Sequence, residues 1–418
     1  MSAEILPFIS VQADWDDVVR EVASNTIPEG SFWIACYMTG SVQGSVKVHR
    51  VGNYEASLEG TNGINVTMLN SRAFNVECEA LDVRDITVYS PKMQLCPIKD
   101  KPITCFDISP NGSLFAAGHG SEISLGSIGS GDIQMTLKGH LSDVATVQFF
   151  PSNLVVLTGG SDFLLKIWSV LDGSNPVTLQ GHTSAITGTA IVSRGRNVLS
   201  SSRDGTVKLW NCGTSSTIAT LGDYESAVNK MILVDLPSRY EPAEKTTLDP
   251  MEVDTEDKLI IVALDDGSIR GLHLGTKKEI FATPISDTPL TSVAYEPETE
   301  TIFAGCKNGL VQVFSLEKGL NQPQLNWKRN GYGISSLVVK TNENGDKVLC
   351  VSSEDGSIYQ TRPLTAFLTS SGSAAVEAEL SGNELETVYD IKIMPSESNS
   401  GHQQRVACAV RDGKIKIY

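Results

Sequence analysis

Two histidines and two aspartates recur in this chain at one fixed spacing, and their types are suited to chemistry. His140 lies 22 residues before Asp162, and His182 lies 22 residues before Asp204. An imidazole and a carboxylate are groups that general acid–base catalysis uses. Two copies separated by 42 residues are instead typical of a structural repeat. We therefore interpret all four side chains as scaffold and not as catalytic groups.

No other motif indicates an active site. The remaining histidines are dispersed, and the sequence contains no HExxH, no GxSxG and no GKS or GKT loop. The glycine-rich string GSIGSG at residues 126–131 precedes no predicted helix, which a phosphate-binding loop requires. Cysteines and histidines show no paired spacing of the kind that zinc sites use. We expect no cofactor, no metal and no enzymatic activity.

The fixed spacing extends to whole segments of the chain. Trp168 and Trp210 are also 42 residues apart, and both segments open with Gly-His. Weaker copies have Asp or Asn, then Gly, then alternating apolar residues, which predicts a tight turn leading into a strand. These weaker copies start at Asp266, Asn308, Asp355 and Asp412. A degenerate copy, Leu114–Ser127, precedes the two strong ones.

Seven units between Lys99 and Tyr418 average about 46 residues, close to the length of a four-stranded propeller blade. The Gly-His and Trp signals resemble the WD-repeat signature. We predict an all-β fold, a seven-bladed WD-repeat β-propeller preceded by a small α+β N-terminal domain. In a WD-repeat blade, His, Asp and Trp share hydrogen bonds with a hydroxyl of the second strand, here Thr158 or Ser200. The structural set is His140, Asp162, Trp168, His182, Asp204 and Trp210.

The chain divides at residue 84 in this interpretation. Residues 1–84 contain no repeat, whereas residues 85–418 form the propeller. Helical spacing of apolar residues after Asp14 predicts one short helix in the N-terminal domain. Alternating apolar residues and Gly or Asn turns predict four strands there. The expected strands are Ser31–Met38, Ser45–Val51, Ile64–Asn70 and Phe74–Val83.

The last unit ends at Tyr418, at the position that Trp holds in the strong repeats, so it supplies three strands. A closed ring needs a fourth strand, and we expect it within residues 85–98, with Asp85–Gln94 as the donor. The fourth unit contains an acidic insertion at residues 235–257. We interpret it as a mobile loop or, alternatively, as a partner-binding arm. Thr369–Asn383 is expected to be a second loop.

Composition excludes several classes of partner. There are 33 Lys and Arg residues against 49 Asp and Glu residues, a net charge of −16, whereas nucleic acids and anionic membranes select clustered basic residues. No apolar run approaches the ~18 residues of a membrane helix. The N-terminus is a poor signal peptide, and eight scattered cysteines favour reduced thiols. We expect a monomer in the cytoplasm and nucleus that binds neither nucleic acid nor membrane and suits a basic protein partner.

One rim of the predicted ring carries the candidate recognition residues. The residue before each turn Asp or Asn points toward that rim, and these residues are Ser161, Arg203, Asp265, Lys307, Glu354 and Arg411. We select Asp143, Asp265 and Glu354 as acidic partner contacts and Arg203 as a contact that sets the register. For each of them the competing interpretation is an ordinary solvated side chain, since few interface residues carry much binding energy.

Two adjacent segments resemble a known family. Residues 191–213, IVSRGRNVLSSSRDGTVKLWNCG, resemble the third repeat of the proteasomal ATPase-associated factor family, and residues 149–174, FFPSNLVVLTGGSDFLLKIWSVLDGS, resemble its second repeat. The resemblance implies an assembly chaperone for the base of the proteasome regulatory particle. Such a chaperone binds the C-terminal domain of one AAA ATPase subunit and is released on completion of assembly.

Two other functions remain open beside this one. The first is a generic WD-repeat scaffold, such as a substrate adaptor of a ubiquitin ligase or a peptide reader. The second is a propeller hydrolase, which no motif supports. The four selected contact residues come from repeat geometry and are not implied by the family.

Overall fold

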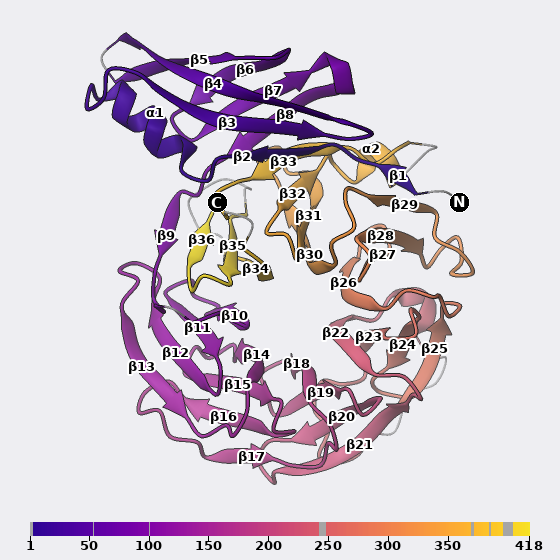
Figure 1. The fold of residues 1–418 in the computed structure, drawn as a ribbon. Helices are drawn as coiled ribbons and strands as arrows, with labels where there is room; N and C mark the ends of the chain where they lie inside the picture. Colours follow the sequence, from indigo (N-terminus) through magenta and orange to yellow (C-terminus); the bar gives the residue numbers. More distant parts are fainter. Residues whose placement is uncertain are drawn as a thin grey trace.

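Strands dominate the structure and form a ring of seven blades with a separate domain at one edge (Figure 1). This computed structural model describes residues 3–52, 54–99, 101–241, 248–368, 372–383, 386–395 and 404–418. The predicted fold class is confirmed: the chain is a β-propeller that follows a small domain of one helix and several strands. No helix in these described ranges is long and apolar enough to cross a membrane.

Each blade is a four-stranded antiparallel sheet whose first strand lies nearest the ring axis. Blades 1 to 3 consist of β10 (Cys105–Ile108), β11 (Leu114–His119), β12 (Glu122–Ser127), β13 (Ile133–Lys138); β14 (Val144–Phe149), β15 (Val155–Gly160), β16 (Leu165–Ser169), β17 (Val177–Leu179); and β18 (Ile186–Val192), β19 (Asn197–Ser202), β20 (Thr206–Asn211), β21 (Ser216–Asp223). Blades 4 to 6 consist of β22 (Val228–Asp235), β23 (Lys258–Leu264), β24 (Ile269–His273), β25 (Lys278–Ala282); β26 (Leu290–Glu296), β27 (Thr301–Cys306), β28 (Leu310–Ser315), β29 (Leu325–Lys328); and β30 (Ile334–Thr341), β31 (Lys347–Ser353), β32 (Ile358–Thr361), β33 (Val376–Leu380).

The hydrophobic core lies between neighbouring blades. Leu157 and Leu165 of blade 2 pack in one cluster with Val198 of blade 3, and Leu199 of blade 3 packs in the next cluster with Ile260 of blade 4. Alternate residues of a strand point to opposite faces of its sheet. Each middle strand therefore contributes apolar side chains to both of its neighbours, which explains why its residues are almost all buried.

Threonines at the inner strands join blade to blade. The Thr104 hydroxyl donates to the carbonyl of Val144 at 2.8 Å, and the Thr187 hydroxyl donates to the carbonyl of Val228 at 2.7 Å. The first bond joins the residue just before β10 to β14, and the second joins β18 to β22. The ring is thus held by polar contacts at the channel as well as by apolar contacts between the sheets.

The seventh blade is completed by a strand from before the first blade. It contains β34 (Val388–Ile393), β35 (Val406–Val410), β36 (Ile415–Ile417) and β9 (Met93–Leu95). Strand β9 pairs antiparallel with β36, with Leu95 opposite Ile415. The donor is therefore shorter than Asp85–Gln94, because β8 (Val83–Tyr89) pairs within the N-terminal domain.

The N-terminal domain consists of two sheets and one helix that share a hydrophobic core. Its elements are β1 (Glu4–Ile5), β2 (Phe8–Val11), α1 (Trp15–Ala23), β3 (Gly30–Tyr37), β4 (Ser41–Gly52), β5 (Glu55–Gly60), β6 (Ile64–Asn70), β7 (Ala73–Cys78), the 3₁₀ turn η1 (Glu79–Leu81) and β8. Helix α1 begins directly after Asp14 and buries Trp15, whose ring meets that of Phe74 edge-on at 4.7 Å. The division at residue 84 falls inside β8, so this sheet extends to Tyr89.

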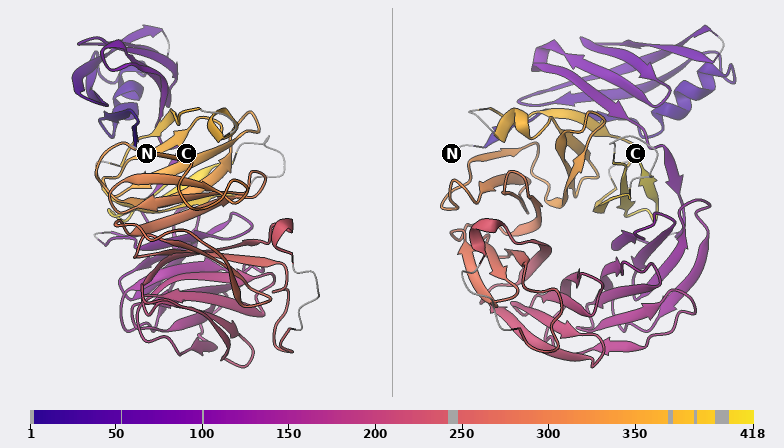
Figure 2. Two further views of the ribbon diagram at one scale, coloured as in Figure 1. Left: turned by 90° about the vertical axis from the view of Figure 1, so that its right-hand side faces the viewer. Right: turned by 180° about the vertical axis from the view of Figure 1, so that it is seen from behind.

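The N-terminal domain is joined to the propeller through its strands. Strand β8 pairs parallel with β33, so blade 6 continues into the N-terminal domain as one seven-stranded sheet. Strand β1 likewise pairs parallel with β29 of blade 5. Figure 2 shows the domain seated on the rim of the disc and not over its channel. The outer edges of blades 5 and 6 are therefore covered.

The insertion in blade 4 is anchored to blade 3 over part of its length. The side-chain amides of Asn197 and Asn211 donate to the Met251 carbonyl at 3.1 and 3.3 Å. Glu252 is buried and pairs with Lys277 at 2.7 Å. The described part of this segment, which follows the 3₁₀ turn η2 (Ser238–Tyr240), is therefore held by side-chain contacts, and the mobile loop and the partner-binding arm both stay predictions. Residues 242–247 of the insertion lie outside the described residues.

The second expected loop, Thr369–Asn383, also differs from the structure. Its described part contains β33, the outer strand of blade 6, preceded by the short helix α2 (Thr365–Leu368). The strand was not predicted because its sequence, VEAEL, contains two glutamates and an alanine, residue types that are depleted in strands. Residues 369–371 lie outside the described residues.

Candidate functional site

The repeated histidine and aspartate of blade 2 meet in a closed hydrogen-bonded set. His140 Nδ1 lies 2.9 Å from Asp162 Oδ2, and its Nε2 lies 2.8 Å from the Thr158 hydroxyl. The Trp168 indole N–H donates to the same hydroxyl at 2.9 Å. This network assigns the proton to His140 Nδ1, because the Asp162 carboxylate can only accept, which leaves Nε2 to accept from Thr158.

Blade 3 repeats the arrangement with a serine. His182 lies 2.8 Å from Asp204 and 2.7 Å from the Ser200 hydroxyl, which accepts from Trp210 at 2.8 Å. Burial lowers the pKa of His182. Burial opposes the charge on Asp204, but hydrogen bonds from the Thr183 N–H and the Thr206 hydroxyl outweigh it and lower the pKa of Asp204 to about 2.

Both sets are structural in their geometry. The side chains of His140 and His182 have no exposed surface, and Thr158 and Ser200 are fully buried. A hydroxyl that cannot be reached by a substrate cannot act as a nucleophile. The structure thus brings the six residues of the repeat set together as two groups of three, one inside blade 2 and one inside blade 3.

The candidate contact residues occupy equivalent positions on one face of the ring. In each of six blades the N–H before the turn Asp or Asn donates to the residue just before the innermost strand, as from Ser161 to Asp143 at 2.8 Å. The equivalent donors are Arg203, Asp265, Lys307, Glu354 and Arg411. We call this side of the ring the turn face, since it carries the turn between the second and third strands of every blade.

Asp143, Arg203, Asp265 and Glu354 are all exposed on the turn face. They belong to blades 2, 3, 4 and 6, so the structure spreads them around the ring and does not gather them into one cluster. Asp265 accepts a hydrogen bond from Asn229 at 3.0 Å. No acidic member of the four forms an ion pair within the described part of the chain.

The channel contains a second group of charged residues, which the sequence did not reveal. Lys392 lies 3.1 Å from Asp390, both on β34 of blade 7, and Asp107 of blade 1 accepts the Phe149 N–H at 2.7 Å. Burial raises the pKa of Asp107 to about 6, although Lys392 opposes the shift. These residues border a cavity of 420 Å³. Among the residues described, no three His, Cys, Asp or Glu side chains gather as metal ligands.

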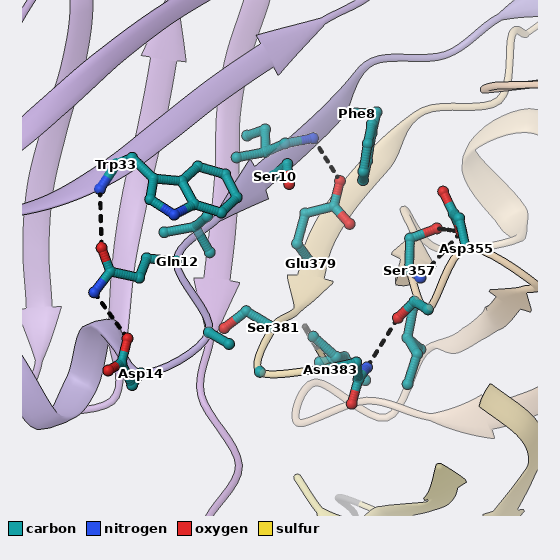
Figure 3. Close-up of a pocket in the computed structure, with 17 residues that line it drawn as sticks. Phe8, Ser10, Gln12, Asp14, Trp33, Asp355, Ser357, Glu379, Ser381 and Asn383 are labelled. Atoms are coloured by element: carbon teal, nitrogen blue, oxygen red, sulfur yellow. Dashed lines mark hydrogen bonds between the residues drawn. The ribbon is translucent and has the colours of Figure 1, made fainter. Parts of the chain in front are cut away.

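A pocket of 340 Å³ lies between the N-terminal domain and blade 6 (Figure 3). Glu379 accepts the Ile9 N–H at 3.1 Å from one side of the pocket, and Arg329 forms an ion pair with Glu379 from the other. Trp33 and Asp14 border its opposite end, where Gln12 links the Trp33 N–H to the Asp14 carboxylate. Glu379 thus joins the two domains, whereas Asp14 bonds within the N-terminal domain and Asp355 within the propeller.

Sequence reasoning did not find Arg329 and Glu379, and no local signal could have shown them. The two residues are 50 positions apart, and neither belongs to a motif. The pocket exists because β2 and β33 are brought together by the docking of the N-terminal domain.

Comparison with known proteins places these features in context. The family model described as "WD domain, G-beta repeat" matches residues 131–169 and 173–211, the segments that hold the two buried sets. Proteasomal ATPase-associated factor 1 of Homo sapiens is 28% identical over 150 residues, which is 35% of this chain and 36% of that protein. Its Bos taurus counterpart is 33% identical over 147 residues, 34% of this chain and 36% of that protein.

The chain resembles the proteasomal ATPase-associated factor family. The similarity expected from the two strong repeats is thereby confirmed. The matched segment covers about a third of the length of these two relatives. WD repeat-containing protein 18 of Homo sapiens is also similar, with 34% identity over 76 residues, 18% of this chain and 17% of that protein.

Proposed function

We propose that this protein is a non-enzymatic assembly chaperone that binds the C-terminal domain of one AAA ATPase subunit of the proteasome regulatory particle base. The relatives named for association with proteasomal ATPases support this proposal. The main structural support is that Asp143, Asp265 and Glu354 are exposed on the turn face. None of the three forms an ion pair within the described part of the chain. An acidic face suits a basic surface on the partner.

The mechanism requires no covalent step. While the propeller is bound to the ATPase C-terminal domain, it sterically hinders premature docking of that ATPase subunit on the proteolytic core. Release follows when a competing contact within the growing particle binds that domain more tightly. The proposal includes a monomeric protein in the cytoplasm and nucleus, which light scattering and cell fractionation test.

Direct binding tests the proposal. Purified C-terminal domains of the regulatory-particle ATPase subunits are titrated against the full chain at low and high salt. We expect one domain to bind, with an affinity that falls as salt screens the contact. Binding of none of them at low salt contradicts the proposal.

A charge-neutral variant locates the interface. Replacing Asp143 and Asp265 by Asn and Glu354 by Gln should weaken binding about tenfold or more. The matched control removes three exposed acids from turns on the opposite face, Glu298→Gln, Glu317→Gln and Glu343→Gln. The control has the same net charge as the test variant, so equal losses in both contradict the turn face as the binding surface.

A generic WD-repeat scaffold is the second candidate, and the similarity to WD repeat-containing protein 18 favours it. A scaffold of this kind reads a linear basic peptide at the rim. Competition by such a peptide, together with no binding of any ATPase domain, would support the scaffold. Capture from lysate of ubiquitin-ligase subunits or histones, with no ATPase subunit, would point the same way.

A further inference from the structure

Among the six blades whose turn begins with Asp or Asn, one turn differs from the other five. The residue after the turn Asp or Asn is glycine in five blades, with a positive φ of 76–86° at Gly205, Gly267, Gly309, Gly356 and Gly413. In blade 2 the same position is Phe163, with φ 69°. The turn is otherwise the same, since the Phe163 N–H donates to the Gly160 carbonyl at 3.2 Å and the Gly205 N–H donates to Ser202 at the same distance.

A phenylalanine is strained in this conformation. The left-handed region brings a β-carbon too close to the following carbonyl, and a bulky side chain there is a genuine outlier. In other blades the position also lacks room, because a β-carbon on Gly205 or Gly413 would lie 2.0 or 2.1 Å from a backbone oxygen. Blade 2 thus differs from these blades in having an unfavourable residue at this position.

Within the described residues, no apolar cluster offsets this strain. Phe163 is 41% exposed, and among the described residues it joins none of the hydrophobic clusters and no aromatic pair. Strained residues that persist without an internal reason concentrate at functional sites. The structure therefore directs attention to what lies beside Phe163 on the surface.

Two further exposed residues are fixed beside it. The Leu141 N–H donates to Asp162 Oδ2 at 2.9 Å, and the Ser161 N–H donates to the Asp143 carbonyl at 2.8 Å. These bonds hold the segment around Phe163 against the segment that carries Leu141, which is 87% exposed, and Asp143. We call Leu141, Asp143 and Phe163 the blade-2 patch. It presents two large apolar side chains next to one carboxylate.

We propose that the blade-2 patch is the apolar anchor of the interface and receives an apolar side chain flanked by Lys or Arg on the ATPase C-terminal domain. The inference rests on the proposed function. A few buried side chains at the centre of an interface, aromatic ones prominent among them, carry most of its energy, whereas exposed charges chiefly steer and orient. Asp143 supplies the charge that a basic neighbour of the anchor requires. Blade 3 offers no such patch, because Thr183 and Gly205 occupy the equivalent positions.

The test exploits opposite effects on binding and stability. Phe163→Gly restores the residue of the other blades, so the melting temperature should stay equal or rise, while affinity for the ATPase domain should fall about tenfold or more. Leu141→Thr copies blade 3 and should weaken binding without touching the strained turn. Leu171→Thr is the matched control, because Leu171 is 74% exposed in the turn between β16 and β17 on the opposite face.

The outcomes separate the two proposals. Loss of binding in both patch variants, with a normal Leu171→Thr variant, supports the anchor. If the wild type binds and the affinity of both patch variants stays within twofold of it, the anchor is overturned and the proposed function stands. If the wild type binds no ATPase C-terminal domain, the proposed function falls, and the partner assigned to the patch falls with it.

Discussion

At the level of single residues, the hydroxyl groups of Thr158 and Ser200 hold the strong repeats together. Each accepts from an indole N–H and donates to a histidine inside a blade. Buried polar groups of this kind are costly when a partner is removed.

Ser200→Ala should therefore destabilise the protein by about 1–3 kcal/mol, because Trp210 Nε1 and His182 Nε2 both lose their partner. Denaturant unfolding measures the change. A free energy of unfolding equal to that of the wild type would show that the shared hydroxyl does not stabilise the blade.

Asp107 should make stability depend on pH. Its pKa is about 6 in the folded protein and roughly 3.9 in an unfolded chain. The folded state binds the proton more tightly, so the contribution of Asp107 to the free energy of unfolding falls as pH rises from about 4 to 6. Asp107→Asn should therefore stabilise the protein by about 1–2 kcal/mol at pH 7.5 and by little at pH 4. An equal effect at both pH values would contradict the raised pKa.

Thiol reactivity should distinguish one cysteine from the rest. Cys96 is exposed, whereas six of the others are buried and Cys212 is intermediate. Burial raises the pKa of Cys306 to about 12 and that of Cys212 to about 11, which keeps both thiols protonated. A maleimide should label one thiol rapidly in the native protein and eight after unfolding, as mass spectrometry can count. Rapid native labelling of several thiols would contradict this burial.

At the level of elements, the repeat predicted the strands of the blades but not the structure of the segments inserted between them. A turn Asp or Asn, usually followed by glycine and then by alternating apolar residues, predicts strand, turn and strand wherever it recurs. It says nothing about Asn197 and Asn211, whose amides hold the insertion of blade 4, because those contacts join segments about 40 residues apart or more. The strand in Thr369–Asn383 was missed because Glu377 and Glu379 break its apolar pattern, and glutamate is depleted in strands.

The closing strand of the ring offers a direct test at this scale. Leu95 of β9 is 7% exposed and packs with Phe106, Ile415 and Ile417, so Leu95→Ala should cost about 2–4 kcal/mol. Met93 on the same strand is 39% exposed and serves as the matched control, with Met93→Ala expected within about 1 kcal/mol. Equal effects of the two variants in thermal or denaturant unfolding would argue against closure by β9.

At the level of the whole molecule, the N-terminal domain and the propeller form one body. The ion pair of Arg329 and Glu379 is almost fully buried where the two meet. The sequence distinguishes the two domains, since only the propeller contains the repeat. It could not show how the two domains join. That junction depends on strand edges, and an edge has no signature in residue type.

Glu379→Ala should destabilise the protein by about 3–5 kcal/mol, because it leaves Arg329 buried without a counter-charge. The N-terminal domain should then become accessible to limited proteolysis. The exposed pair of Arg84 and Asp82 provides the comparison, and Arg84→Ala should change stability by less than about 1 kcal/mol. A Glu379→Ala protein with wild-type stability would contradict the role of this pair in joining the domains.

The pairing of β8 with β33 and of β9 with β36 has a consequence for how the protein is made. One edge of β8 pairs early with β7, but its other edge and the strand β9 must wait for partners near the other end of the chain, at Ala378 and Ile415. At roughly 5–20 residues per second a ribosome needs tens of seconds to reach them. During that interval the N-terminal strands emerge with open edges and the first blades stand without closure. A nascent chain of this kind is a natural client for ribosome-associated chaperones, and its yield should be sensitive to the speed of translation.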